Sequence, residues 1–138
     1  MRNQHSTCLV SACLIGLCTR YDGQIKANPG CLAQIKSLSW IPVCPEQLGG
    51  LPTPREAADI VGGDGRDVLA GKAAVVTKSG IDLTADFIRG AEQVLQLARL
   101  QQIGMAFLKA GSPSCAVHGK IGVTAALLQS NGIKLTEF

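Results

Sequence analysis

The sequence predicts an α/β fold, in which a single three-layer domain over residues 1–138 has a mostly parallel sheet covered by helices on both faces. Three observations indicate this fold. Short apolar runs typical of strands alternate with segments whose apolar residues recur at helical spacing. The 138 residues suffice for one hydrophobic core. The chain also shows no internal repeat or linker that would divide it into two units.

Strands are predicted at four short apolar runs. They are residues 7–13, 40–44, 105–109 and 133–136. Pro42 lies within the second run and has no amide hydrogen to donate. Because proline is tolerated in sheets mainly at an edge, we expect the second strand to be an edge strand.

Helices are predicted at residues 29–38, 84–102 and 123–129. In the first, Asn28 is the expected N-cap, and a proline occupies the first helical position. In the second, Thr84 is the expected cap, and Gly90 in its interior costs about 1 kcal/mol relative to alanine.

Between the strand predicted at residues 40–44 and the helix predicted at residues 84–102, the apolar residues follow no regular spacing. Residues 45–55 (PEQLGGLPTPR) contain paired glycines and three prolines, and we expect no regular structure there. Thr53 and Pro54 then suit the start of a short helix that reaches Val61. Residues 67–70 and 73–77 are predicted to form a small hairpin.

Composition excludes several classes of protein. The chain is 46% hydrophobic and 17% charged with a net charge of +3, which excludes a disordered tail and a strongly basic nucleic-acid binder. With only three Phe, one Trp and one Tyr, there is little basis for stacking bases, so stable nucleic-acid binding is not expected. No run approaches the roughly 20 apolar residues of a membrane span. Six cysteines are too few for a disulfide scaffold of this length, so we expect a reducing cytoplasm.

Three cysteines follow predicted strands. Cys13 and Cys44 end the first and second strands, and Cys115 lies in the turn after the third. Because the carboxyl ends of parallel strands share one edge of the sheet, we expect these thiols to meet there. The alternative is that each is a small core residue, which is the interpretation we favour for Cys8 and Cys31.

Three converging thiolates suit two kinds of site. One is an iron-sulfur cluster that lacks a fourth protein ligand, and the other is a zinc site with an open position. No pair of cysteines has the spacing of a zinc ribbon. The sequence leaves open whether Cys18 or His118 joins the site.

Polar residues beside these cysteines are candidates for catalysis. Glu46 follows Cys44 by two residues and is either a general acid/base or a solvated carboxylate. Ser112 and Ser114 either shape the turn before Cys115 or bind a polar edge of a substrate. Residues 20–22 form a local network or line the same crevice.

Five segments together resemble the DUF523 family, which includes a thiouracil desulfurase. They are residues 10–23 (VSACLIGLCTRYDG), 40–55 (WIPVCPEQLGGLPTPR), 60–65 (IVGGDG), 108–115 (LKAGSPSC) and 122–128 (GVTAALL). The resemblance implies a 4Fe-4S cluster held by Cys13, Cys44 and Cys115, with Glu46 and Ser112 in catalysis. This chain departs from the family pattern at residues 116–120, where the loop after Cys115 is shortened.

The expected function is therefore non-redox desulfuration of a thiolated pyrimidine, taken up as a small base or nucleoside, with release of sulfide and the carbonyl product. Two alternatives remain. The shortened loop leaves open a non-catalytic cluster or sulfide carrier, and the thiolate count with His118 leaves open a zinc-binding domain.

Overall fold

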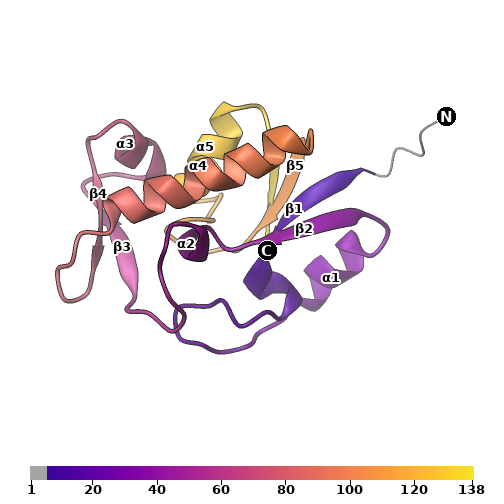
Figure 1. The fold of residues 1–138 in the computed structure, drawn as a ribbon, viewed down its shortest axis with the longest axis horizontal. Coiled ribbons are helices and arrows are strands. Elements are labelled where there is room, and N and C mark those ends of the chain that lie inside the picture. The colour runs from indigo at the N-terminus through magenta and orange to yellow at the C-terminus, as the bar shows by residue number, and fades with distance from the viewer. Residues whose placement is uncertain (1–5) are drawn as a thin grey trace.

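The computed structural model describes residues 6–138 and contains a four-stranded parallel sheet (Figure 1). Its strand order is β2-β1-β5-β6. The strands are β1 (Thr7–Ser11), β2 (Ser39–Val43), β5 (Met105–Leu108) and β6 (Lys134–Glu137). All four predicted strands are present. β2 is an edge strand, as Pro42 predicts, and Pro42 pairs in register with Val10.

Helices cover both faces of this sheet, so the predicted α/β fold is confirmed. Leu9 and Leu108 point to the face covered by α4 (Thr84–Leu100) and α5 (Val123–Ser130). Val10 and Phe107 point to the other face, against the 3-10 helix η1 (Ala12–Ile15) and α1 (Pro29–Ile35). This alternation is the two-residue period of strands. In Figure 1, α4 and α5 lie above the strands and α1 lies below them.

The segment between β2 and α4 differs from its prediction. A short helix, α2 (Pro45–Leu48), begins in the stretch for which we expected no regular structure. The helix predicted from Thr53 to Val61 is wrong, because residues 53–57 form no helix and the stretch ends in a strand, β3 (Ala58–Val61). β3 pairs antiparallel with β4 (Ala74–Thr77).

The predicted hairpin is also wrong. Residues 65–69 form a helix, α3 (Gly65–Leu69), in place of its first strand. The Asp64 side chain accepts hydrogen bonds from the amides of Arg66 and Asp67, and the Asp67 carboxylate accepts one from the Asp64 amide. This reciprocal capping box stabilises the start of a helix.

N-caps were predicted for α1 and α4, and one of the two predictions is confirmed. The Asn28 side chain accepts a hydrogen bond from the Cys31 amide and caps α1, as expected. Thr84 is instead the first residue of α4, and its hydroxyl accepts a hydrogen bond from the Val75 amide. It therefore ties the helix to β4.

Backbone-to-backbone contact joins α2 to α4. A Cβ atom on Gly90 would lie 2.8 Å from the carbonyl carbon of Pro45, and closer still to the carbonyl oxygen. Gly49, just after α2, approaches the backbone of Asp86 in the same way, and Arg89 donates a hydrogen bond to the Gly49 carbonyl at 2.7 Å. Gly90 thus allows α2, which directly follows Cys44, to lie against α4.

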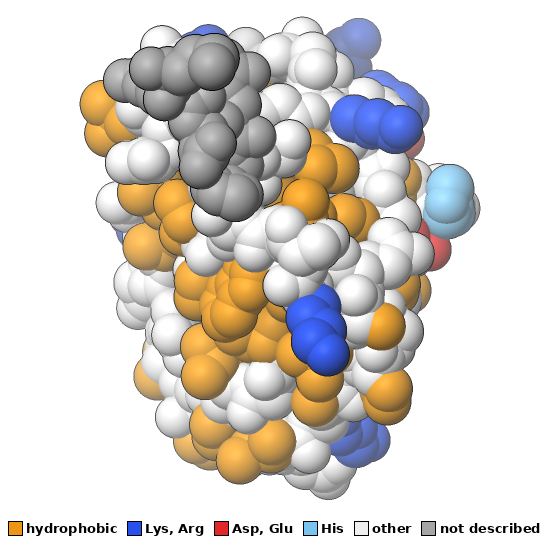
Figure 2. All heavy atoms as spheres, turned by 90° about the vertical axis from the view of Figure 1, so that its right-hand side faces the viewer, with side chains coloured by type: hydrophobic (Ala, Val, Ile, Leu, Met, Phe, Trp, Pro, Cys, Tyr) orange, Lys and Arg blue, Asp and Glu red, His pale blue; other side chains and the backbone are white. Residues whose placement is uncertain are grey.

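β1 and β2 begin at the end of the sheet opposite Cys13 and Cys44. On the surface at that end, hydrophobic side chains gather near the centre of the view, and acidic side chains are few (Figure 2). Trp40, early in β2, is 41% exposed. Within residues 6–138, none of the helices combines the length and the apolar character needed to span a membrane.

Candidate functional site

The three cysteines predicted to converge lie at the carboxyl edge of the parallel sheet. Cys13 is in η1, directly after β1, and Cys44 is the N-cap residue of α2, directly after β2. Cys115 follows β5 in a turn held by Ser112, whose hydroxyl oxygen accepts hydrogen bonds from the Ser114 and Cys115 amides at 3.1 Å each. Parallel strands in register bring these three segments to one edge.

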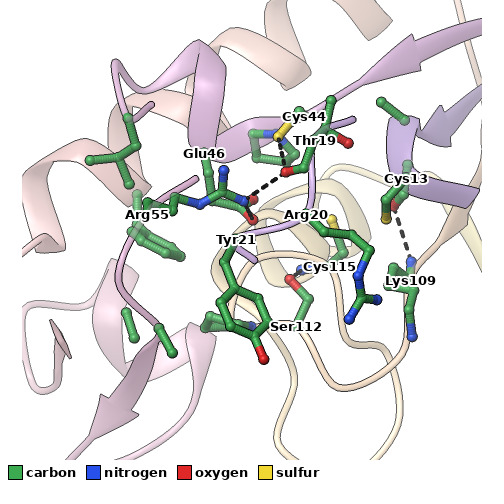
Figure 3. A pocket seen from close by; sticks show the side chains of 18 of the residues that line it. Cys13, Thr19, Arg20, Tyr21, Cys44, Glu46, Arg55, Lys109, Ser112 and Cys115 are labelled. Atoms are coloured by element: carbon green, nitrogen blue, oxygen red, sulfur yellow. Dashed lines mark hydrogen bonds and ion pairs between the residues drawn. The ribbon is translucent and has the colours of Figure 1, made fainter. Parts of the chain in front are cut away.

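One cavity of about 350 Å³ is lined by all three cysteines (Figure 3). Glu46 and Ser112, the two residues predicted to take part in catalysis, line the same cavity. The cavity is comparable in size to small-molecule sites in other proteins. The structure therefore brings together every residue of the predicted site.

Burial makes these thiols harder to ionise. It raises the pKa of Cys13 and of Cys44, and the Glu46 carboxylate raises both further. The pKa of Cys115 is raised most, first by burial and then by Glu46, while a hydrogen bond from Ser11 acts in the opposite direction. A metal takes the place of the thiol protons on binding, so a cationic metal group would offset this cost.

Glu46 is held at one oxygen and free at the other. Its Oε2 accepts a hydrogen bond from Arg55 at 3.0 Å, and the two side chains are 13% and 10% exposed. Its Oε1 is buried and has no hydrogen-bond partner among the described residues. A buried polar atom without a partner is costly, which favours a ligand or water at this position.

Cationic and aromatic side chains also line the cavity. Arg20 and Tyr21 line it from the loop after η1, and Lys109 lines it from the end of β5. Arg20 also forms an ion pair with Asp22 at 3.2 Å, so the expected local network and the expected cavity lining are both present. In Figure 3 the Tyr21 ring projects toward Ser112, and the Arg20 side chain extends toward Lys109.

Five other residues that the sequence analysis considered lie outside the cavity wall. Cys18 is exposed and donates a hydrogen bond to the Gly23 carbonyl at 3.3 Å. His118 is also exposed, and its amide bonds to Glu137. Cys8 and Cys31 are buried in the apolar cluster under α1, as predicted. Ser114, fully buried, is outside the residues that line the cavity.

The residues of the cavity wall that sequence reasoning missed include three polar side chains, those of Ser11, Lys109 and Arg55. Ser11 ends β1, and its hydroxyl accepts a hydrogen bond from the Lys109 amide at 3.0 Å. Lys109 follows β5 as Cys44 follows β2, so its position after a strand was a usable signal. Arg55 carried no such signal, because it follows no predicted strand and its bond to the Thr19 carbonyl joins segments far apart in the sequence.

The donor set of the cavity is made of three cysteine thiols. Within residues 6–138, no three His, Cys, Asp or Glu side chains come close enough together to hold one metal ion. The three thiols instead lie around the wall of a shared cavity. Cysteine sulfur is a soft donor and is the usual ligand of iron-sulfur clusters.

Comparisons with known proteins extend over nearly the whole chain. A family model described as 2-thiouracil desulfurase matches residues 8–137. The uncharacterized protein YbbK of Bacillus subtilis strain 168 is 40% identical over 139 residues, covering 92% of this chain and 92% of that protein. A solved structure of the 4Fe-4S-dependent thiouracil desulfidase TudS matches with a TM-score of 0.78 and 40% identity, covering 96% of this chain and 90% of that one.

Proposed function

This chain belongs to the 2-thiouracil desulfurase family, and from that premise we propose that it converts the C=S group of a thiolated pyrimidine to C=O. Water supplies the oxygen, sulfur leaves as hydrogen sulfide, and no electrons are gained or lost overall. Membership of the family also confirms the resemblance found in the sequence. The observation that carries the proposal is the buried, unpartnered Glu46 Oε1 in the cavity that three cysteines line.

We propose that Cys13, Cys44 and Cys115 hold a 4Fe-4S cluster. Three soft donors around a shared cavity fit such a group, and the similarity to a 4Fe-4S-dependent desulfidase supports it. When bound through three thiolates, the cluster supplies an iron without a protein ligand, a Lewis acid suited to a soft sulfur atom. The zinc alternative is less well supported, because His118 lies outside the cavity wall.

Glu46 is proposed as the general base. Its Oε1 takes a proton from the attacking water as the new C–O bond forms and C=S becomes a single bond, and it returns this proton to the sulfur. The remaining hydroxyl proton passes to the sulfur through the same carboxylate as the C–S bond breaks, which gives C=O and hydrogen sulfide. Arg55 holds Oε2 at 3.0 Å, so Oε1 is the oxygen available for this transfer. General acid/base catalysis of this kind contributes typically 10² to 10⁴ in rate.

Ser112 is proposed to orient the substrate. Its oxygen already accepts two amide hydrogen bonds, which leaves its own hydrogen for donation. The remaining exocyclic carbonyl of a thiouracil is a suitable acceptor. The same two hydrogen bonds fix the turn before Cys115, so Ser112 would link substrate position to cluster position.

The size of the cavity supports a free base or nucleoside as the substrate, in preference to a nucleic acid. We place the reaction in the cytoplasm, where thiols stay reduced.

Glu46→Gln tests the proposal, since it keeps the shape of the side chain and removes the base. Enzyme reconstituted anaerobically with iron and sulfide is supplied with 2-thiouracil, and sulfide and uracil are measured over many turnovers. We expect repeated turnover by the wild type and a loss of at least about 100-fold in the variant at equal iron content. Sulfide exchange without turnover would identify a carrier, and full activity of the variant would exclude Glu46 as the base.

A further inference from the structure

The Arg55 side chain makes four hydrogen bonds, which is more than an ion pair with one carboxylate requires. Its Nη2 donates to Glu46 Oε2 and to the Thr19 carbonyl, each at 3.0 Å. Its Nη1 donates to the Pro52 carbonyl at 3.2 Å and to the Thr53 hydroxyl at 3.0 Å. The Arg55 side chain is only 10% exposed. Its guanidinium is therefore fixed from both sides.

These contacts join segments that are far apart in the sequence. Thr19 belongs to the loop that follows Cys13, and the backbone amide of Arg55 also donates to the Tyr21 carbonyl in that loop at 2.8 Å. The Thr19 carbonyl in turn accepts a contact from the Cys44 sulfur at 3.8 Å. Figure 3 shows Arg55 between this loop and Glu46. One side chain thus connects the loop after Cys13 with the helix that carries Glu46.

We infer that Arg55 is a positioning residue that holds Glu46 with Oε2 engaged and Oε1 facing the cavity, and that fixes the loop at residues 19–23 as a cavity wall. This inference rests on the proposed function and extends it to the residue that orients its base. Arg55 acts through Glu46 and the loop, and the reaction needs no direct contact between Arg55 and the substrate.

The geometry requires arginine. A planar guanidinium can donate to Glu46 and to Thr19 from one nitrogen while its other nitrogen bonds to Pro52 and Thr53. A lysine ammonium is a single point of charge on a flexible chain and cannot serve all four acceptors. The other arginine of the cavity wall, Arg20, is engaged by Asp22 and is not available to replace it.

The test compares Arg55→Lys, Arg55→Gln and Arg55→Ala with the wild type in reconstituted enzyme. Arg66→Gln is the matched control, because that arginine is 64% exposed and pairs with Asp64, the N-cap residue of α3. In all three Arg55 variants we expect kcat to fall by about 100-fold, because misplacing the Glu46 carboxylate by about 1 Å has an effect of this size. KM should change less than about threefold, because ground-state binding is largely kept.

Two further readouts separate positioning from a general structural role. The first is the iron content per chain, which should equal that of the wild type. The second is rescue of Arg55→Ala by the missing group: about 20 mM guanidinium, far below denaturing concentrations, should restore part of kcat. A kcat close to that of the wild type, a parallel loss of iron, or no recovery with guanidinium would each overturn the inference.

Failure of the proposed function can be recognised separately. If the wild type releases no sulfide, hydrogen exchange of the amides at residues 19–23 still tests Arg55 without any substrate. Exchange that is faster in Arg55→Gln than in Arg66→Gln would support the positioning of the loop. Equal exchange in the two variants would refute it.

Discussion

Gly90→Ala is a sharp test of how the fold sets the position of Cys44 and Glu46. In α4, Gly90 faces the backbone of Pro45, the first residue of α2, which lies between Cys44 and Glu46 in the chain. The added Cβ would lie 2.8 Å from the Pro45 carbonyl carbon. Ordinary carbon–carbon contact begins near 3.5 Å, so α2 and α4 must separate by at least about 0.7 Å.

Two opposing terms determine the stability of this variant. Replacing a helical glycine by alanine stabilises by about 1 kcal/mol, whereas forcing a methyl group into a packed interface costs about 1–3 kcal/mol. The net change is a destabilisation of about 0–2 kcal/mol, which leaves the protein folded. Activity should suffer more, because a shift of this size at a catalytic group costs up to about 100-fold in rate.

Urea unfolding and sulfide release from 2-thiouracil measure the two effects in the same preparation. Gly104→Ala is the control, since nothing lies within 4 Å of the Cβ that it adds. We expect the control to retain full activity. The reasoning would be refuted by a Gly90→Ala enzyme that is as active as the control, because the contact between α2 and α4 would then have no part in placing Glu46.

Three further changes have defined outcomes. Cys18→Ser should keep the full iron content, because that sulfur is exposed and bonds to a backbone carbonyl, and a loss of iron would assign it to the site. Burial raises the pKa of Cys31 from 9.0 to about 11. Its neutral thiol therefore stabilises the fold below pH 9, and up to about 3 kcal/mol is lost as pH rises toward 11. Urea unfolding at about pH 8 and about pH 10.5 should show this loss in the wild type and less of it in Cys31→Ala, whereas equal losses would exclude Cys31 as the cause. For Glu137, burial alone would raise the pKa, but hydrogen bonds from the His118 and Val117 amides lower it overall. That stabilisation is present at neutral pH and is lost as pH falls through the lowered pKa. Glu137→Gln should cost about 1 kcal/mol at pH 7 and little in acid, measured by thermal unfolding, and an equal cost at both would contradict the charge-based explanation.

The sequence predicted the parallel sheet because its strands depend on local pattern. The runs that became β1 and β5 are apolar, short and bounded by turn residues, and they are buried on both faces as such runs predict. The convergence of Cys13, Cys44 and Cys115 followed from topology alone, since each comes after a parallel strand.

Long-range contacts explain what could not be predicted. β3 looked like the end of a helix because its partner, β4, lies beyond the intervening helix α3 in the chain. Gly90 looked like a local defect, since its partner Pro45 is far away in sequence. Arg55 gave no signal for the same reason. The capping box of Asp64 and Asp67 was a local signal that the hairpin prediction overlooked.

The most direct measurement is the iron and sulfide content of anaerobically reconstituted protein, for the wild type beside the single variants Cys13→Ala, Cys44→Ala and Cys115→Ala, with Cys8→Ala as a control in the core. The account predicts about four iron and four sulfide ions per chain in the wild type and the control, and substantial loss in each of the other three. A wild type that binds no iron, or that keeps its full complement when any one of the three cavity cysteines is removed, would contradict it.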